Sequence, residues 1–162
     1  MHITIEHWPE TLAAFQELEL FDLRDPHHTT ALFLVALDLF IKDQDMGVKA
    51  INLLKGPVVL NPHNISFLKD RLIDKPYLPK AYFDGATPEN DYVPDDPFTL
   101  KLFKDQRPDD LEEDYMRVFV KTSGADSKRF VTLRRKDDHW YLWDYPGILM
   151  DIRKPKQDNP WL

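Results

Sequence analysis

The stretch YMRVFVKTSGADSKRFVTLRRKDDHWYLWDY, residues 115–145, decides the fold, because it predicts three consecutive antiparallel strands. Apolar and polar side chains alternate in its first part, where Met116, Val118 and Val120 are separated by Arg117 and Phe119. Aromatic and basic side chains stand on both faces of the resulting sheet. One face must pack on the protein, and the other must meet a loop, a ligand or a second subunit, because soluble proteins seldom leave such a face open.

Two turns set the predicted strand register. Residues 122–127 (TSGADS) suit a hairpin loop, and Asp137 with Asp138 suits a two-residue turn. Antiparallel partners keep a constant index sum, so the pairs across the second turn are Lys136 with His139, Arg134 with Tyr141, Thr132 with Trp143 and Phe130 with Tyr145. The same register predicts cation–π pairs of Arg134 with Tyr141 and of Arg135 with Trp140.

Four helices are predicted in the first half of the chain. Residues 31–41 are apolar almost all round except Asp38, which predicts a helix buried on most sides. The boundary signals are capping residues, prolines at helix starts and one glycine just past a helix end. They are Pro9 and Glu10 for the first helix, Asp25 and Pro26 for the second, Asp43 or Asp45 and then Gly56-Pro57 for the third, and Asn61-Pro62 for the fourth.

Residues 76–97 hold five prolines among several aromatic residues. This segment is too aromatic for a disordered linker and too rich in proline for a helix or a central strand. We expect an ordered loop that packs on the body and is the best loop candidate for a site lid. A strand follows, in which Phe98, Leu100 and Leu102 alternate with other residues.

The 162 residues therefore predict one α+β domain. It has a helical half (1–75), the loop (76–97), and a sheet half with a tail (98–162), and its helices pack on an antiparallel sheet of about four strands. This order is similar to the cone-shaped folds of the nuclear-transport-factor and scytalone-dehydratase superfamily, or to a cystatin-like arrangement. Such folds host enzymes, binders and oligomerisation modules alike, so they imply no particular function.

Composition excludes several functions. A net charge of −7 argues against a protein dedicated to nucleic acid or anionic membranes, because its field repels polyanions. The chain has no cysteine, which excludes disulfides, thiolate catalysis and cysteine zinc sites. It also lacks a signal-peptide pattern, and its longest apolar run is too short to span a bilayer. We expect a cytoplasmic protein without cofactor or metal.

Other polar clusters carry no specific motif. His27 and His28 are adjacent, which on a helix does not aim both at one metal, so polar residues around a helix start are the simpler interpretation. Residues 121–129 offer hydroxyls and cations for an anion but lack phosphate-loop spacing, so an ordinary hairpin is favoured. Residues 105–114 carry six acids without calcium-loop spacing and suit a solvated connector.

Several short motifs carry a resemblance. They are PYLP (76–79), YFDGATPEN (82–90), FVK (119–121), SGADS (123–127), WYLW (140–143) and IRKP (152–155). Together they resemble a family of uncharacterised bacterial proteins, mainly from Firmicutes, over roughly residue 61 to the end of the chain. The resemblance implies a bacterial origin and an established domain, and it brings no activity, ligand or catalytic residue.

We therefore expect a non-enzymatic binding or protein-interaction module, with a protein or a second copy of the chain as its partner. The ligand or partner face is predicted to comprise Tyr82, Tyr92, Arg117, Arg134, Tyr141, Trp143 and Tyr145. The alternative is a small enzyme or metabolite binder with a pocket between helices and sheet, in which Arg117, Arg134 or His139 orients an anionic ligand.

Overall fold

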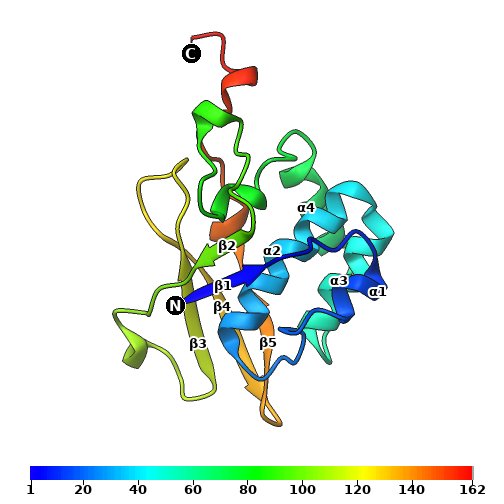
Figure 1. Cartoon of the computed structure of the whole chain (residues 1–162). Coiled ribbons are helices and arrows are strands. Elements are labelled where there is room, and N and C mark those ends of the chain that lie inside the picture. The colour runs from blue at the N-terminus through cyan, green and yellow to red at the C-terminus, as the bar shows by residue number, and fades with distance from the viewer. Residues whose placement is uncertain (162) are drawn as a thin grey trace.

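The computed structural model describes residues 1–161 (Figure 1). These residues contain four α-helices and five β-strands, joined by loops and short 3-10 helices. The helices are α1 (Leu12–Gln16), α2 (Pro26–Lys42), α3 (Gln44–Lys55) and α4 (Pro62–Leu72). The strands are β1 (His2–Ile5), β2 (Phe98–Lys101), β3 (Tyr115–Val120), β4 (Arg129–Lys136) and β5 (His139–Asp144). A short 3-10 helix, η4 (Pro146–Leu149), follows β5.

Side-chain caps define where the longer helices begin. The Asp25 carboxylate accepts a hydrogen bond from the His27 backbone N–H, and Asp43 accepts one from the Met46 N–H, which settles the start of α3 at Asp43. Asn61 forms a reciprocal capping box with Asn64 at the start of α4. These three starts follow the predicted chemistry. The first helix starts later than predicted, after its cap Thr11.

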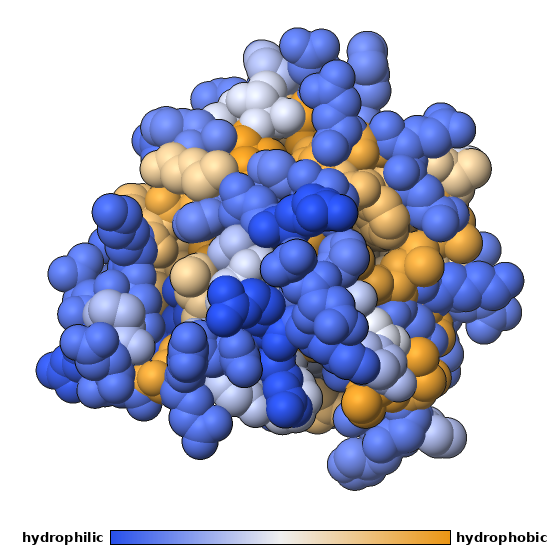
Figure 2. Space-filling view, turned by 90° about the horizontal axis from the view of Figure 1, so that it is seen from below, coloured by the Kyte–Doolittle hydropathy of each residue, from blue (hydrophilic) through white to orange (hydrophobic). Residues whose placement is uncertain are grey.

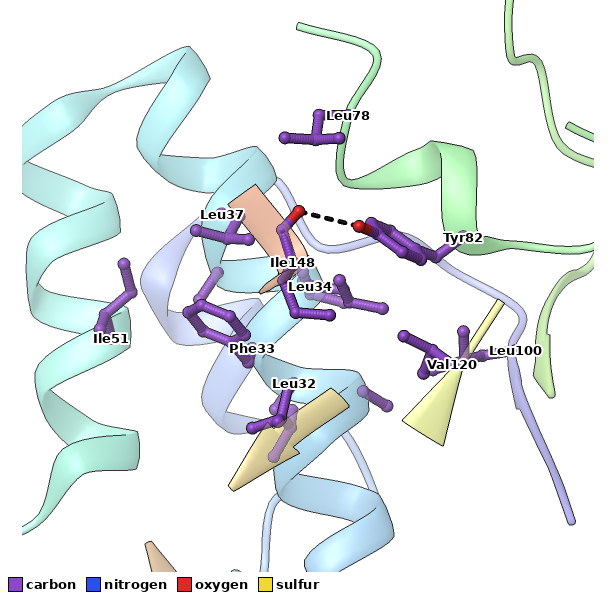
Figure 3. Packing of buried hydrophobic residues seen from close by; sticks show 14 of the residues in the cluster. Leu32, Phe33, Leu34, Leu37, Ile51, Leu78, Tyr82, Leu100, Val120 and Ile148 are labelled. Carbon is purple, nitrogen blue, oxygen red and sulfur yellow. Dashed lines mark hydrogen bonds between the residues drawn. The ribbon is translucent and has the colours of Figure 1, made fainter. Parts of the chain in front are cut away.

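Helix α2 forms the centre of the protein and lies between the three-stranded sheet and the other helices (Figure 1). Figure 3 shows Phe33 and Leu37 of α2 together with Ile51 of α3 and Val120 of β3, all of which are buried. Burying such side chains gains about 1.5–3 kcal/mol each. The exception in this helix is Asp38, whose carboxylate accepts hydrogen bonds from Trp8 Nε1 at 2.8 Å and Lys42 Nζ at 3.0 Å.

The strands form two separate antiparallel sheets, so the prediction of one sheet with about four strands is wrong. β2 pairs with the N-terminal strand β1, with Ile3 opposite Leu100, while β3, β4 and β5 form a three-stranded sheet in that order. A single bridge between Phe103 and Phe119 connects the two within the described chain. β1 has only four residues and its partner lies more than 90 positions away, so nothing local identifies it as a strand.

The register of the last hairpin is confirmed near its turn and wrong beyond it. Lys136 pairs with His139 and Arg134 with Tyr141 across Asp137 and Asp138, which adopt φ values of 51° and 63°. The register then shifts by one residue, so that Thr132 lies opposite Asp144 instead of Trp143. The predicted pair of Phe130 with Tyr145 is also wrong, because β5 ends at Asp144 and Tyr145 packs on Phe33 of α2 at a ring-centroid distance of 4.7 Å.

The loop of residues 76–97 is attached to the protein by two tyrosines. The Tyr82 hydroxyl donates a hydrogen bond to the Ile148 carbonyl at 2.8 Å (Figure 3) and accepts one from Arg129 at 3.1 Å. Tyr92 stacks on Tyr77, and its hydroxyl donates to the Arg153 carbonyl at 2.6 Å. Both tyrosine side chains therefore point into the protein and hold the segments that follow β5.

Candidate functional site

A cleft of about 600 Å³ lies between the loop that follows α3 and the outer face of β4 and β5. Pro57 and Val58 of the loop form one wall. Tyr141 and Trp143 of β5 contribute aromatic rings to the opposite wall. Its volume falls within the range of small-ligand and side-chain pockets, about 300–1,000 Å³. We call it the aromatic–cationic cleft.

Gly56 brings the two walls together. It ends α3 with φ 69° and ψ −126°, a conformation that side chains other than glycine rarely adopt. A Cβ at this position would lie 2.6 Å from Tyr141 Cδ1 and 2.7 Å from Tyr141 Cε1, closer than carbon atoms pack. The absence of a side chain at Gly56 therefore lets the loop lie directly against the Tyr141 ring. The sequence signal of Gly56-Pro57 predicted the helix end but not this contact.

The cleft is basic although the protein is acidic. Four cations and one carboxylate line it, and the carboxylate, Asp114, is already engaged by Arg135 at 3.0 Å. The other three cations, Lys55, Arg134 and Lys136, form no ion pair within 4.0 Å in the described chain. Three positive charges thus remain free to meet an anionic group.

Arg134 is held in place by aromatic rings instead of by a carboxylate. Its guanidinium carbon lies 4.7 Å from the centroid of the Trp143 ring and 5.3 Å from that of Tyr115. Those two rings meet edge to face at 5.7 Å. The predicted cation–π pair of Arg134 with Tyr141 is not found among the described residues, and the guanidinium packs on Trp143 and Tyr115 instead. The predicted pair of Arg135 with Trp140 is confirmed at 5.6 Å.

Trp143 keeps 46% of its surface exposed and Val58 keeps 64%. Burial of so much apolar surface by a ligand would be favourable, at roughly 25 cal/mol per Å². Seen from below, toward the turn between β4 and β5, the molecule is mostly hydrophilic and its hydrophobic residues appear in separate patches (Figure 2). The cleft places exposed apolar side chains next to cations that form no ion pair.

Lys55 is partly desolvated where it lines the cleft. Burial lowers the pKa of its amine from the usual value, and the charge of Asp144 acts in the opposite direction. An anionic group placed next to Lys55 would favour the protonated amine and restore the lost solvation. This electrostatic state suits a site that receives an anion.

The structure brings together three of the seven residues predicted for the ligand or partner face, namely Arg134, Tyr141 and Trp143. Arg117 lies on the same sheet but is engaged elsewhere, since its Nε donates to Asp105 Oδ2 at 2.6 Å. Tyr82, Tyr92 and Tyr145 pack inside the protein, away from the cleft. Burial raises the pKa of Tyr92 and that of Tyr145 to about 12, and it also raises the pKa of Tyr82.

Sequence reasoning missed the parts of the cleft that come from outside the sheet. Lys55, Pro57 and Val58 lie about 80 positions before β5, and no pattern in the chain shows that the end of α3 reaches Tyr141. Lys136 and Asp114 were recognised only as a hairpin residue and as part of an acidic connector. His139, the alternative ligand-orienting residue, does not line the cleft.

A larger groove of about 840 Å³ runs between β1 and α1. Four glutamates line it, all of them solvent-exposed, together with the rings of His7 and Trp8. Exposed glutamates are fully solvated, whereas the aromatic–cationic cleft holds the partly desolvated Lys55 next to an exposed aromatic ring, so volume alone does not decide between the two sites. Residues 1–161 contain no group of three or more His, Asp or Glu side chains arranged to hold a metal ion. No helix among these residues is both long and apolar enough to cross a membrane.

Comparison with protein families assigns the chain to one family. A family model described as domain of unknown function (DUF6935) matches residues 7–156, and the chain belongs to this family. The match extends further toward the N-terminus than the motifs that carry the resemblance, and it confirms a domain of unknown function. No curated protein and no solved structure matches the chain. The bacterial origin stays a prediction.

Proposed function

We propose that this protein is a non-enzymatic binding module of the bacterial cytoplasm, and that the aromatic–cationic cleft is its binding site. Its ligand carries at least one negative charge next to an apolar or aromatic group. The observation behind the proposal is that three cations without an ion pair, Lys55, Arg134 and Lys136, line the same cleft as the exposed ring of Trp143, on which Arg134 packs.

Two physical arguments support this ligand class. A carboxylate, sulfonate or phosphate next to Arg134 or Lys55 forms charge-assisted hydrogen bonds, which are about twice as strong as neutral ones. An apolar or aromatic group between Val58 and the rings of Tyr141 and Trp143 removes exposed apolar surface from water. Each half of such a ligand meets the side chains that suit it.

Binding is favoured over catalysis by the side chains in the cleft. Among the described residues that line it there is no histidine, serine or threonine, and its one carboxylate is paired with Arg135. Proton transfer needs a base and an acid within hydrogen-bond reach of a substrate. The alternative of a small enzyme would have to use the Lys55 amine, whose lowered pKa is the one observation in its favour.

A fluorescence titration with 8-anilinonaphthalene-1-sulfonate tests the proposal, because this probe combines a sulfonate with aromatic rings. We expect saturable binding to the native protein at low micromolar protein concentration. Arg134→Gln should weaken it about fivefold, corresponding to about 1 kcal/mol for one partly exposed charged contact. Trp143→Ala should weaken it about tenfold or more, because the ring contributes contact area as well as stacking.

Two exposed lysines outside the cleft provide matched controls. Lys49→Gln removes a charge from α3, the helix that also carries Lys55, and Lys121→Gln removes one after β3. Both variants should bind the probe as the native protein does. Equal binding by the Arg134, Trp143 and control variants would show that the probe does not occupy the cleft and would contradict the proposal.

A further inference from the structure

An acidic segment begins at the edge of the aromatic–cationic cleft. Residues 109–113 have the sequence DDLEE and lead directly into Asp114, which lines the cleft. Asp109, Glu112 and Glu113 are solvent-exposed and form no ion pair within the described chain. The protein thus presents three unpaired carboxylates next to three unpaired cations.

Backbone hydrogen bonds fix the end of the segment at the edge of the sheet. The Arg135 N–H donates to the Asp114 carbonyl at 2.8 Å, which attaches the end of the segment to the edge of the sheet. The Tyr115 N–H donates to the Glu112 carbonyl at 3.0 Å and closes a turn just before β3. Asp109, Glu112 and Glu113 are exposed and form no ion pair within one described copy, whereas Asp110 lies 4.0 Å from Arg117.

We propose that the aromatic–cationic cleft receives the acidic segment 109–113 of a second copy of this chain, and that the second copy's cleft receives the same segment of the first. The inference rests on the proposed function of the cleft and names its partner. A site and its complementary segment that adjoin on one face form a self-complementary patch, which is the requirement for a two-fold dimer. In such a dimer both contacts form at once.

The spacing of the charges favours a peptide segment over a compact anion. Arg134 and Lys136 are two residues apart on β4, so their Cα atoms are separated by roughly 6.6 Å along the strand. The segment spreads several carboxylates along a 3-10 helix, η3 (Pro108–Asp110), and the turn that follows it, whereas a phosphate group carries its charge at a single centre. Leu111, at the centre of the segment, supplies the apolar side chain that the surface of Val58 and Trp143 would bury.

Nucleic acid is the less suitable polyanion. Asp114 lines the cleft, Asp144 is near enough to Lys55 to influence its pKa, Asp137 and Asp138 directly follow Lys136 in the chain, and the whole chain carries a net charge of −7. A continuous phosphate backbone would have to approach all these carboxylates. A short segment of the protein itself needs to enter only the cationic part.

Sedimentation velocity with charge-reversed variants tests the dimer. The native protein should approach twice the 19.1 kDa mass of one chain as concentration rises, and added salt should weaken the association. Arg134→Glu with Lys136→Glu makes the cleft acidic, and Glu112→Lys with Glu113→Lys makes the segment basic. Each double variant alone should be monomeric, because both of its reciprocal contacts become repulsive.

Mixing the two double variants restores both contacts at once, so the mixture should dimerise although neither component does. Lys49→Glu with Lys69→Glu changes the net charge as much as the cleft variant does, at exposed positions on α3 and α4, and should dimerise as the native protein does. Circular dichroism checks that each variant is folded. A mixture that stays monomeric while the native protein dimerises would overturn this interface.

A native protein that stays at 19.1 kDa up to about 1 mM would also overturn the inference. In that case the sulfonate titration still decides the proposed function, because it is carried out on the monomer. Binding of a synthetic peptide of sequence DDLEED to a monomeric native protein would assign the cleft to an acidic segment of another protein. Binding of a single-stranded oligonucleotide that competes with the sulfonate would assign it to nucleic acid.

Discussion

Replacement of Gly56 by alanine tests the contact that forms the cleft. Alanine at φ 69° and ψ −126° occupies a sparsely populated backbone region, which costs about 1–3 kcal/mol. Its Cβ would lie 2.6 Å from Tyr141 Cδ1, and relief of such a contact in a packed region costs about 1–3 kcal/mol more. The unfolded chain has a lower conformational entropy with alanine than with glycine, and this difference offsets about 0.4–1 kcal/mol of the destabilisation. We expect Gly56→Ala to lower the free energy of unfolding by about 2–4 kcal/mol.

Urea denaturation followed by tryptophan fluorescence measures this change, and Gly147→Ala is the matched control. A Cβ at Gly147 would meet only Arg129 Cβ, at 4.0 Å, and its φ is not in the left-handed region, so this variant should change stability by less than about 0.5 kcal/mol.

A double-mutant cycle separates the clash from the backbone strain. Tyr141→Ala removes the ring that the new Cβ would meet, so Gly56→Ala should cost less in that background, with a coupling of about 1 kcal/mol or more. Two results would refute the view that glycine at position 56 is needed for the loop to pack on Tyr141. One is a loss of unfolding free energy below about 0.5 kcal/mol for Gly56→Ala in the native background, and the other is an equal loss with and without the Tyr141 ring.

Three further predictions concern side chains that stabilise the folded protein. Tyr82→Phe should lower the free energy of unfolding by about 1–3 kcal/mol, because the buried Ile148 carbonyl loses its donor, and unchanged urea denaturation would contradict this. Trp8→Phe should lower the free energy of unfolding by a similar amount, because the hydrogen bond from Trp8 to Asp38 is lost. In an Asp38→Ala background that hydrogen bond is already absent, so Trp8→Phe should lower the free energy of unfolding by less. Stability should also fall as the pH rises from about 10 to 12, because the pKa of Tyr92 is about 12 in the folded protein and about 10 in the unfolded chain, so the unfolded state loses its proton first. Urea denaturation at pH 9 and pH 11 checks the last point, and equal stability at the two values would count against it.

The helix boundaries were predictable because their causes are local. Asp25, Asn61 and Gly56 each act on backbone groups within three residues, and their chemistry can be recognised without any knowledge of the tertiary structure. The turn at Asp137 and Asp138 is local in the same sense, and the strand pairs next to it followed correctly. Predictions failed as soon as they depended on residues far along the chain.

Strand β1 and the register shift in β5 show this limit. The four residues of β1 pair with β2, which lies more than 90 positions further along the chain, and no local pattern marks them as a strand. The alternation of side chains in β5 is compatible with an unbroken register, so it indicates neither the shift at Thr132 and Leu133 nor the packing of Tyr145 on Phe33 of α2.

The candidate site was predictable in part for the same reason. Arg134, Tyr141 and Trp143 belong to one hairpin, so an analysis of the hairpin found them. Lys55 and Val58 enter the cleft from the end of α3, and only the tertiary structure shows that contact. Tyr82, Tyr92 and Tyr145 were assigned to the ligand face because they are aromatic. Tyr82 and Tyr92 are buried with hydroxyls that donate to backbone carbonyls, and the Tyr145 ring packs on Phe33.

The most direct test of the binding cleft is a two-dimensional ¹H–¹⁵N NMR titration of the native protein with 8-anilinonaphthalene-1-sulfonate. Our account predicts that the largest shifts occur at the Trp143 indole N–H and at the backbone amides of Lys55, Arg134 and Tyr141. Shifts confined to the groove between β1 and α1, or no saturable shift at any amide, would contradict it.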